Sequence, residues 1–248
     1  MPHKIKLRRF LANTGIFRNR YETEKALESG LVKVDNKTVK GGSFDVKKKH
    51  HVFYNNKEIK MVAKSIYIIL NKPIGYLSQK DPSRKNVYDI VNQMKEFSDD
   101  EKKTMFNVGR LDIDTEGLLI MTNDGQLSNK IINSSKFFEK TYFVILDKPL
   151  LPKDKLQLEK GVKIVVKKDG KRLYYKTREA KVKLLDDKEL ELTITEGKKR
   201  QIRKMLMALG YAVVFLKRIS IGRLSTGSLT PGQHKILAKE EIYDNLFG

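Results

Sequence analysis

The sequence predicts an α+β protein in two parts, and three observations support this prediction. Residues 1–62 are strongly basic and show two short helical patterns followed by short alternating strands. Residues 63–248 continue with strand and helix patterns in mixed order, which is typical of an extended, largely antiparallel sheet flanked by helices. The chain has 248 residues, enough for two domains that each bury a hydrophobic core.

The first part is expected to begin with two helices. The first helix has an apolar stripe at helical spacing, made of Ile5, Leu7, Phe10 and Leu11. Arg8 and Arg9 then face outward, and Gly15 is placed to end this helix. A second helix is expected from Tyr21 to Ser29, with Gly30 as its C-terminal cap.

A small sheet is predicted to follow these helices. Residues 31–34 alternate up to a turn at Asp35-Asn36, and residues 51–54 pair with residues 58–61 across a turn at Asn55-Asn56. The order of elements in this part is therefore helix, helix, sheet.

The second part begins after a linker at residues 62–65. Apolar or alternating runs predict strands at residues 66–70, 118–121, 139–146, 160–166, 174–185, 189–195 and 213–221. Helical patterns are expected at residues 87–94, 126–133, 153–157 and 198–209. No repeat or low-complexity tract interrupts this order.

The charge indicates an anionic partner. The chain carries 51 Lys and Arg against 30 Asp and Glu, a net charge of +21, and residues 1–62 alone hold 15 cations against 6 anions. The basic residues are not gathered into one amphipathic helix, and no run of about 18 apolar residues or apolar signal peptide is present. We therefore expect a cytoplasmic protein that binds nucleic acid and no membrane.

Cysteine and histidine usage excludes several kinds of chemistry. The absence of Cys removes disulfides, thiolate catalysis and iron–sulfur clusters. Of the four histidines, His50 and His51 are adjacent, while His3 and His234 stand alone. We therefore expect no metal site.

The basic first part resembles the alpha-L RNA-binding domain, also called the S-four type. The residues that carry the resemblance are Leu7–Ala12, Gly15 and Gly30–Asn36. This resemblance implies that residues 1–62 form an RNA-binding domain and that Arg8, Arg9, Arg18 and Arg20 contact RNA. The chain reads Phe17-Arg18-Asn19-Arg20-Tyr21 where the family usually opens its second helix with Ser-Arg. The competing interpretation is a basic surface that is merely solvated.

An acidic loop is the most distinctive segment of the second part. Residues 108–125 read VGRLDIDTEGLLIMTNDG, with Asp112, Asp114 and Glu116 close together ahead of a buried strand. Loops that hold carboxylates against a rigid sheet edge are common sites of reactive groups. The alternative is an ordinary turn in which Asp112 or Asp114 caps the backbone and Asp124-Gly125 closes a hairpin.

A basic helix is the second candidate segment. Residues 196–206 read EGKKRQIRKML, and a step of about 100° per residue places Ile202 and Met205 on one stripe, with Arg203 at its boundary. An arginine at such a boundary can bury its stem and hold a carboxylate ionised. The alternative is a surface helix whose cations meet solvent.

Together these segments resemble the pseudouridine synthases, in the branch of RsuA, RluB, RluE and RluF. Four motifs occur in the family's order, at residues 71–75 (NKPIG), 109–125, 139–142 (EKTY) and 196–205. The resemblance covers nearly the whole chain. It implies a catalytic domain at residues 63–248 that isomerises uridine to pseudouridine in ribosomal RNA, without cofactor or metal, and we expect a monomer.

The resemblance also implies roles for individual residues. The family's catalytic carboxylate maps to Asp112, which can act as a nucleophile or as a base. Arg203 maps to its basic partner, Ile202 to the apolar residue beneath the target base, and Tyr142 to the aromatic that stacks on the flipped uracil. The other implied RNA contacts are Arg110, Lys199, Arg200 and Lys204.

Two other functions fit parts of the pattern. A non-enzymatic RNA-binding or ribosome-assembly protein would explain the charge, although it would not need Asp112. A DNA-binding regulator fits less well, because helix-turn-helix, zipper and zinc-finger patterns are absent from the sequence. Within ribosomal RNA, Lys199 and Arg200 favour the large subunit.

Overall fold

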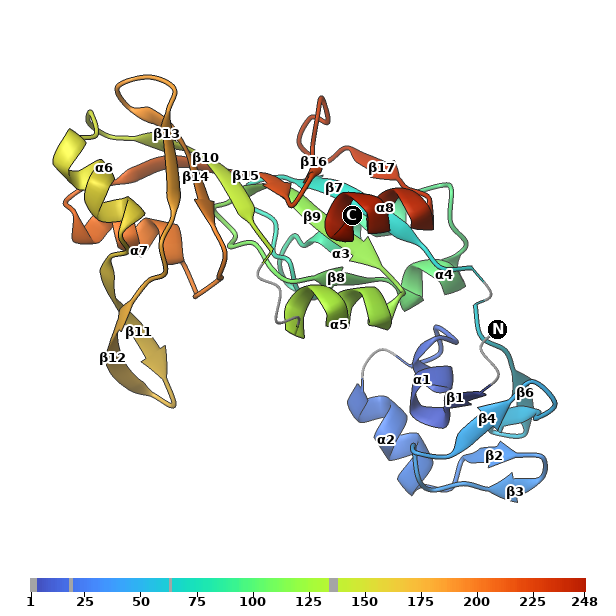
Figure 1. Cartoon of the computed structure of the whole chain (residues 1–248). Helices are drawn as coiled ribbons and strands as arrows, with labels where there is room; N and C mark the ends of the chain where they lie inside the picture. The colour runs from blue at the N-terminus through green and yellow to red at the C-terminus, as the bar shows by residue number, and fades with distance from the viewer. Residues whose placement is uncertain (1–3, 18–19, 63, 134–137) are drawn as a thin grey trace. The chain divides into compact units, whose positions relative to one another are not determined.

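The computed structural model describes residues 4–17, 20–62, 64–133 and 138–248, and the chain divides into two compact units (Figure 1). The first unit contains residues 1–66 and 90–106, and the second contains residues 67–89 and 107–248. The sequence suggested a single division after residue 62. Residues 90–106 group with the first unit instead of with their neighbours in sequence, a grouping that no local pattern indicates.

Two hairpins form the sheet of the first unit, in the order β3-β2-β5-β6. Strand β2 (Val32–Val34) pairs with β3 (Lys37–Thr38), and β5 (Val52–Tyr54) pairs with β6 (Lys57–Ile59). The turn residues Asp35 and Asn36 have φ of 45° and 66°, and Asn55 and Asn56 have φ of 50° and 61°. Positive φ at both central residues defines the tight hairpin turn that Asn and Asp favour, so both predicted turns are confirmed.

The helices of this unit differ slightly from the prediction. Ile5 lies in strand β1 (Lys4–Lys6), which pairs with β4 (Asp45–Lys47), so helix α1 begins only at Leu7 and ends at Ala12. Helix α2 spans Arg20–Glu28. The unpredicted helix α4 (Asp99–Thr104) begins with a capping box formed by Ser98 and Glu101. The apolar faces of α1 and α2 close over the small sheet and form its hydrophobic core.

The second unit contains a nine-stranded sheet with the order β13-β14-β10-β15-β9-β7-β17. Strand β16 (Leu224–Ser225) pairs with β15, and β8 (Phe106–Val108) pairs with β9. The other strands are β7 (Tyr67–Lys72), β9 (Glu116–Thr122), β10 (Lys140–Leu146), β13 (Lys181–Leu184), β14 (Glu189–Ile194), β15 (Val213–Ile221) and β17 (His234–Ile236). Of the pairings with a described register, β15 with β9 is parallel and the others are antiparallel. The predicted mixed, largely antiparallel sheet is confirmed.

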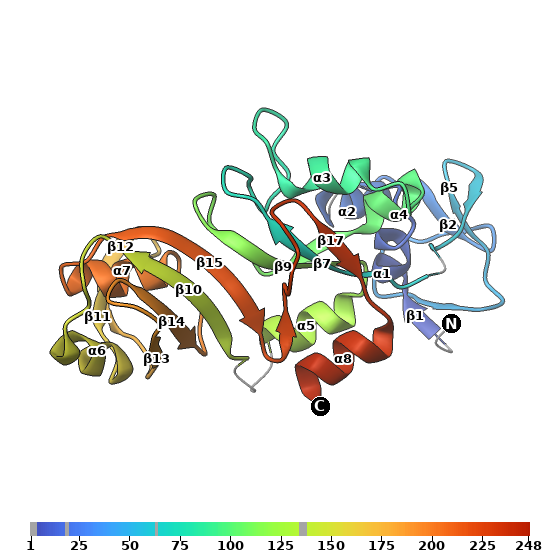
Figure 2. The same cartoon turned by 90° about the horizontal axis from the view of Figure 1, so that it is seen from above.

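Helices cover this sheet at two places (Figure 2). Helices α5 (Gly125–Asn133) and α8 (Lys239–Phe247) bury Leu127, Ile242 and Leu246 against β7 and β9. At the other end, α6 (Pro152–Glu159) and α7 (Gln201–Ala208) pack with β10, β13 and β14 around a second core. Helix α3 (Val87–Gln93) joins the two units in sequence. In the part of the chain that the structure describes, none of the helices has the length and apolar character needed to cross a membrane.

Two sequence predictions in this unit, and one detail of the alternative interpretation of the acidic loop, need correction. The predicted strand 174–185 is two separate strands, β12 (Lys171–Lys176) and β13. The chain leaves β12 at Thr177, whose N–H donates to the Val162 carbonyl and whose Oγ1 accepts from the Val162 N–H, at the base of the hairpin that contains β12. The predicted helix 198–209 begins at Gln201, since Arg200 has φ of 55°, in the left-handed region. Asp124 does not close a hairpin; its Oδ1 accepts from the N–H groups of Gln126 and Leu127 and caps helix α5.

Candidate active site

The loop that carries Asp112 is held by the segment that follows β7. The N–H of Leu111 donates to Ser78 Oγ at 3.0 Å, and this hydroxyl donates to the Leu111 carbonyl at 2.8 Å. The N–H of Gly75 donates to the carbonyl of Ile113 at 2.8 Å. Residues 71–78 and residues 109–115 are therefore fixed side by side, although more than 30 residues separate them in sequence.

A close approach between strands sets the end of this loop. Gly117 has φ of 116°, and a Cβ atom at this position would lie 2.3 Å from the carbonyl oxygen of Arg218. Glycine is required here because β9 and β15 pair in parallel at this point, where Arg218 is opposite Gly117. The strand pairing thus fixes where the acidic loop meets the sheet.

Asp114 is the carboxylate that binds the two arginines. Nη1 of Arg200 lies 2.9 Å from its Oδ1, and Nη2 lies 2.8 Å from its Oδ2, which is a bidentate pair. Nε of Arg203 lies 3.2 Å from Oδ2, within ion-pair range but outside hydrogen-bond geometry, and Nη2 donates to the Asp114 carbonyl at 2.7 Å. Burial alone would raise the pKa of Asp114, but the hydrogen bond from Arg200 and both positive charges lower it.

The predicted pairing of Arg203 with Asp112 is therefore wrong in this structure. Among the described residues, Arg203 pairs with Asp114 and forms no ion pair with Asp112. The loop turns at this point, since the N–H of Thr115 donates to the Asp112 carbonyl at 3.1 Å. Asp114, inside this turn, is the acid that meets the two arginines.

Asp112 remains partly exposed. No side chain in the described ranges forms a hydrogen bond or ion pair with its carboxylate. Its charge nevertheless acts on the arginines. The pKa of Arg200 is raised chiefly by Asp114 and to a smaller extent by the charge of Asp112. Burial lowers the pKa of Arg203, and the same two carboxylates oppose this effect. Asp112 thus lies within electrostatic range of both cations while its oxygens stay available.

Tyr142 and Ile202 lie in the hydrophobic core next to this loop. Tyr142 is 9% exposed in β10, Ile202 is 4% exposed in α7, and both belong to the cluster that contains Leu111, the residue before Asp112. The fold therefore places the predicted aromatic and apolar residues in the same hydrophobic core as Leu111. Both are buried core residues in this structure.

The remaining predicted contacts of this unit lie at the surface. Arg110 is exposed and donates through Nη1 to Gln79 Oε1 at 3.1 Å. Lys199 is exposed in the segment before α7, and Lys204 is partly exposed on α7. Arg200 is engaged with Asp114, as described above.

Lys72 is a residue near the site that sequence reasoning missed. It ends strand β7, is fully buried, and donates through Nζ to the carbonyls of Pro73 and Tyr76 at 2.7 and 2.8 Å. Burial lowers the pKa of Lys72 to about 8, although the charges of Asp114, Asp112 and Glu116 favour the protonated form. A lysine inside the 71–75 motif was visible in the sequence, but its burial was not.

The predicted RNA contacts of the first unit are partly engaged with a carboxylate. Nε of Arg8 lies 2.5 Å from Glu24 Oε1, and Nε of Arg20 lies 3.3 Å from the same oxygen. Arg9 is exposed. Arg18 lies outside the described residues.

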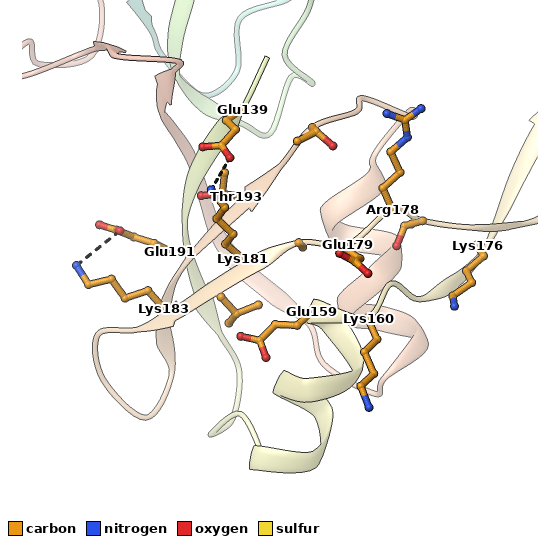
Figure 3. A pocket seen from close by; sticks show the side chains of 14 residues that line it. Glu139, Glu159, Lys160, Lys176, Arg178, Glu179, Lys181, Lys183, Glu191 and Thr193 are labelled. Atoms are coloured by element: carbon orange, nitrogen blue, oxygen red, sulfur yellow. Dashed lines mark hydrogen bonds and ion pairs between the residues drawn. The ribbon is translucent and has the colours of Figure 1, made fainter. Parts of the chain in front are cut away.

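A groove of about 1100 Å³ in the second unit does not contain the predicted catalytic residues. Its lining combines both signs of charge, and Figure 3 shows Lys181 paired with Glu139 and Lys183 paired with Glu191. Because carboxylates partner these lysines, the groove does not offer a uniformly cationic surface to phosphates.

Comparison with known proteins identifies the class to which this fold and loop belong. The sequence pattern of the RNA pseudouridylate synthase family matches residues 66–208, the region that holds the acidic loop and the whole of α7. The chain belongs to this family and is an RNA pseudouridine synthase.

Relatives and a solved structure agree over nearly the full chain. A Bacillus subtilis protein named uncharacterized RNA pseudouridine synthase YtzG is 36% identical, covering 96% of this chain and 97% of the relative. Ribosomal small subunit pseudouridine synthase A of Escherichia coli is 33% identical, covering 88% of this chain and 90% of the relative. A crystal structure of a pseudouridylate synthase matches with a TM-score of 0.67 and 30% identity, covering 98% of this chain and 100% of that chain.

Proposed function

We propose that this protein isomerises a specific uridine of ribosomal RNA to pseudouridine and that Asp112 is the reacting carboxylate. The observation that carries the proposal is the contrast between two neighbouring acids. Asp114 is taken up by Arg200 and Arg203, whereas the Asp112 carboxylate is partly exposed and has no protein partner among the described residues. A reacting group needs free oxygens, and Asp112 has them.

The reaction can be written with its atoms balanced. The bond between ribose C1′ and uracil N1 breaks, and a bond between C1′ and uracil C5 forms. The hydrogen on C5 leaves as a proton, and N1 gains a proton. An ionised Asp112 can serve as a nucleophile toward sugar or base, or as the base that removes a ribose proton.

The other residues have supporting roles in this proposal. Arg203, 15% exposed, fixes the acidic loop through Asp114 and adds positive charge beside Asp112. The Tyr142 ring would stack on the flipped base after a local shift, since it is buried in this structure. Ile202 would support the base from below, and Arg110, Lys199 and Lys204 would contact phosphates. Residues 1–62 would act as the alpha-L RNA-binding domain.

Small-subunit ribosomal RNA is the substrate that we propose to test first. Three relatives, from Escherichia coli, Haemophilus influenzae and Salmonella typhimurium, carry the small subunit in their names. The prediction of large-subunit RNA from the sequence relied on Lys199 and Arg200. In the structure, Arg200 is hydrogen-bonded to Asp114. Ribosomal RNA as substrate also supports a cytoplasmic location.

The test is release of tritium from C5-labelled uridine in small- and large-subunit ribosomal RNA. Asp112→Asn keeps the size of the side chain but removes its charge, so we expect release to vanish while gel-shift affinity stays equal or improves. Asp187→Asn, the same change in an exposed loop, is the control and should match wild type. Full activity of Asp112→Asn would reject the assignment of this residue. No release by wild type on either RNA would favour the RNA-binding protein.

A further inference from the structure

A two-stranded ribbon in the second unit presents a cationic and aromatic face. Strand β11 (Lys163–Lys168) pairs with β12 (Lys171–Lys176) in a sheet of its own. Figure 1 shows this hairpin extending beyond the neighbouring helices α6 and α7. Directly opposed residues share a face, so the register defines an outward face, here called the ribbon face, made of Lys163, Val165, Lys167, Arg172, Tyr174 and Lys176.

The ribbon face is exposed along its whole length. All six residues are exposed, with Tyr174 at 76% and Val165 at 43%. Four of them are cations and none is an acid; Asp169 lies at the turn. In the groove of Figure 3, by contrast, Lys181 and Lys183 are paired with carboxylates. Lys176 belongs to the ribbon face and also lines this groove.

Cations face each other across the two strands of the ribbon face, and they repel each other when no anion is bound. Lys163 lies opposite Lys176, and Lys167 lies opposite Arg172. Like charges directly across an antiparallel pair destabilise it. None of these four cations has an ion-pair partner among the described residues. An anionic ligand on the ribbon face would therefore relieve repulsion built into the hairpin.

The ribbon face also carries an aromatic ring, that of Tyr174. Its ring stands opposite Val165, and Nζ of Lys163 lies 4.7 Å from the ring centroid. An aromatic ring among cations matches the surfaces that bind single-stranded nucleic acid, where rings stack on bases and cations track the backbone. A base inside a duplex has no free face to offer the ring.

The opposite face anchors the ribbon to the candidate active site. Ile164 is buried in the core, and the Tyr175 hydroxyl donates to Glu196 Oε2 at 2.5 Å. Glu196 Oε1 also accepts from Gln201 Nε2 at 2.8 Å, in the first turn of α7. Because α7 carries Arg203, the ribbon is fixed to the same segment as the cations beside the acidic loop.

We propose that the ribbon face binds an unpaired stretch of the RNA substrate, with Tyr174 stacking on a base and the four cations contacting phosphates. This inference rests on the proposed function only for the identity of the RNA. An unpaired stretch held here supplies affinity that does not depend on the reacting uridine or on residues 1–62.

The test measures binding of full-length protein to oligocytidylate, a single strand that contains no uridine, across a salt series. Tyr174→Ala should weaken binding about tenfold. Leu173→Ala, on the opposite face, is its control and should bind as wild type. The double variant Lys167→Gln/Arg172→Gln should lower the slope of log affinity against log salt by about 1.4. Its control, Lys153→Gln/Lys160→Gln on and just after helix α6, should not change the slope.

Each alternative outcome has a distinct meaning. Wild-type binding by both ribbon variants would overturn the inference, whatever their tritium release. Equal losses in the control variants, or an equal effect of Tyr174→Ala on a duplex RNA, would also overturn it, because then stacking at this face does not decide binding. If the ribbon variants lost binding to phosphatidylserine vesicles but not to RNA, the partner would be a membrane. Loss of RNA binding by these variants, with no tritium release by wild type, would leave the ribbon inference standing while the proposed function fails.

Discussion

Asp114→Asn tests whether the cluster of Asp114, Arg200 and Arg203 holds the site together. The change keeps the size of the side chain and removes the charge that both guanidiniums share. The Arg200 pair is screened, because the two side chains are 40% and 37% exposed, and it contributes about 0.5–1 kcal/mol. The Arg203 side chain is 15% exposed, and its pair with Asp114 contributes about 1 kcal/mol.

The total loss of unfolding free energy is therefore about 1.5–2 kcal/mol. For a chain of this size it corresponds to a fall in Tm of about 3–8 °C, measurable by calorimetry. Because the pKa of Asp114 is lowered in the folded state, this contribution is present above the ordinary carboxyl pKa of 3.8 and is lost as the pH falls through the lower, folded pKa. The Tm difference between wild type and variant should shrink at acid pH.

The kinetic effect should exceed the effect on stability. Without Asp114, the guanidinium of Arg203 loses its position next to Asp112, and misplacement by about 1 Å can lower kcat about 100-fold. RNA affinity should stay equal or rise, since a negative charge is removed. A double-mutant cycle with Arg200→Gln should give a coupling above about 0.5 kcal/mol. Asp187→Asn is the control. Unchanged Tm and unchanged kcat in Asp114→Asn would refute the reasoning.

Three further predictions concern other groups. Arg203→Met should lower kcat strongly while its affinity for RNA falls only modestly. Lys204→Met should lower the affinity for all RNAs alike and keep kcat. Equal losses of affinity and kcat in Arg203→Met would make Arg203 a phosphate contact. The pKa of Lys72 is about 8 in the folded chain and 10.5 ordinarily, so the unfolded chain binds more protons between pH 8 and pH 10.5. The free energy of unfolding should therefore rise with pH over this interval. Lys72→Met should lack this rise in denaturant titrations. Glu24→Gln should strengthen RNA binding and steepen its salt dependence by freeing Arg8 and Arg20; no change in filter binding would argue against these arginines as contacts.

Local patterns in the sequence determined the class of fold and most of its elements. The hairpin turns at Asp35-Asn36 and Asn55-Asn56 follow from residues that tolerate positive φ, a property of each residue alone. The longer strands of the large sheet are visible as apolar or alternating runs, whereas the short strands β8, β16 and β17 were not predicted. The ordered motifs indicated the enzyme family that the comparisons confirm. The roles of Asp112, Tyr142 and Ile202 stay predictions.

Tertiary structure alone decided which charged groups meet. The sequence offered three acids within five positions and several arginines. In the fold, the loop turns at Thr115, and Asp114 is the acid that pairs with Arg200 and Arg203. The burial of Lys72 depends on the loop that folds over it, whose carbonyls accept its hydrogen bonds. The ribbon face depends on the hydrogen bond between Thr177 and Val162, where the predicted strand 174–185 is interrupted. Ion pairs and burial depend on distances between segments far apart in the chain, and only the folded backbone sets those distances.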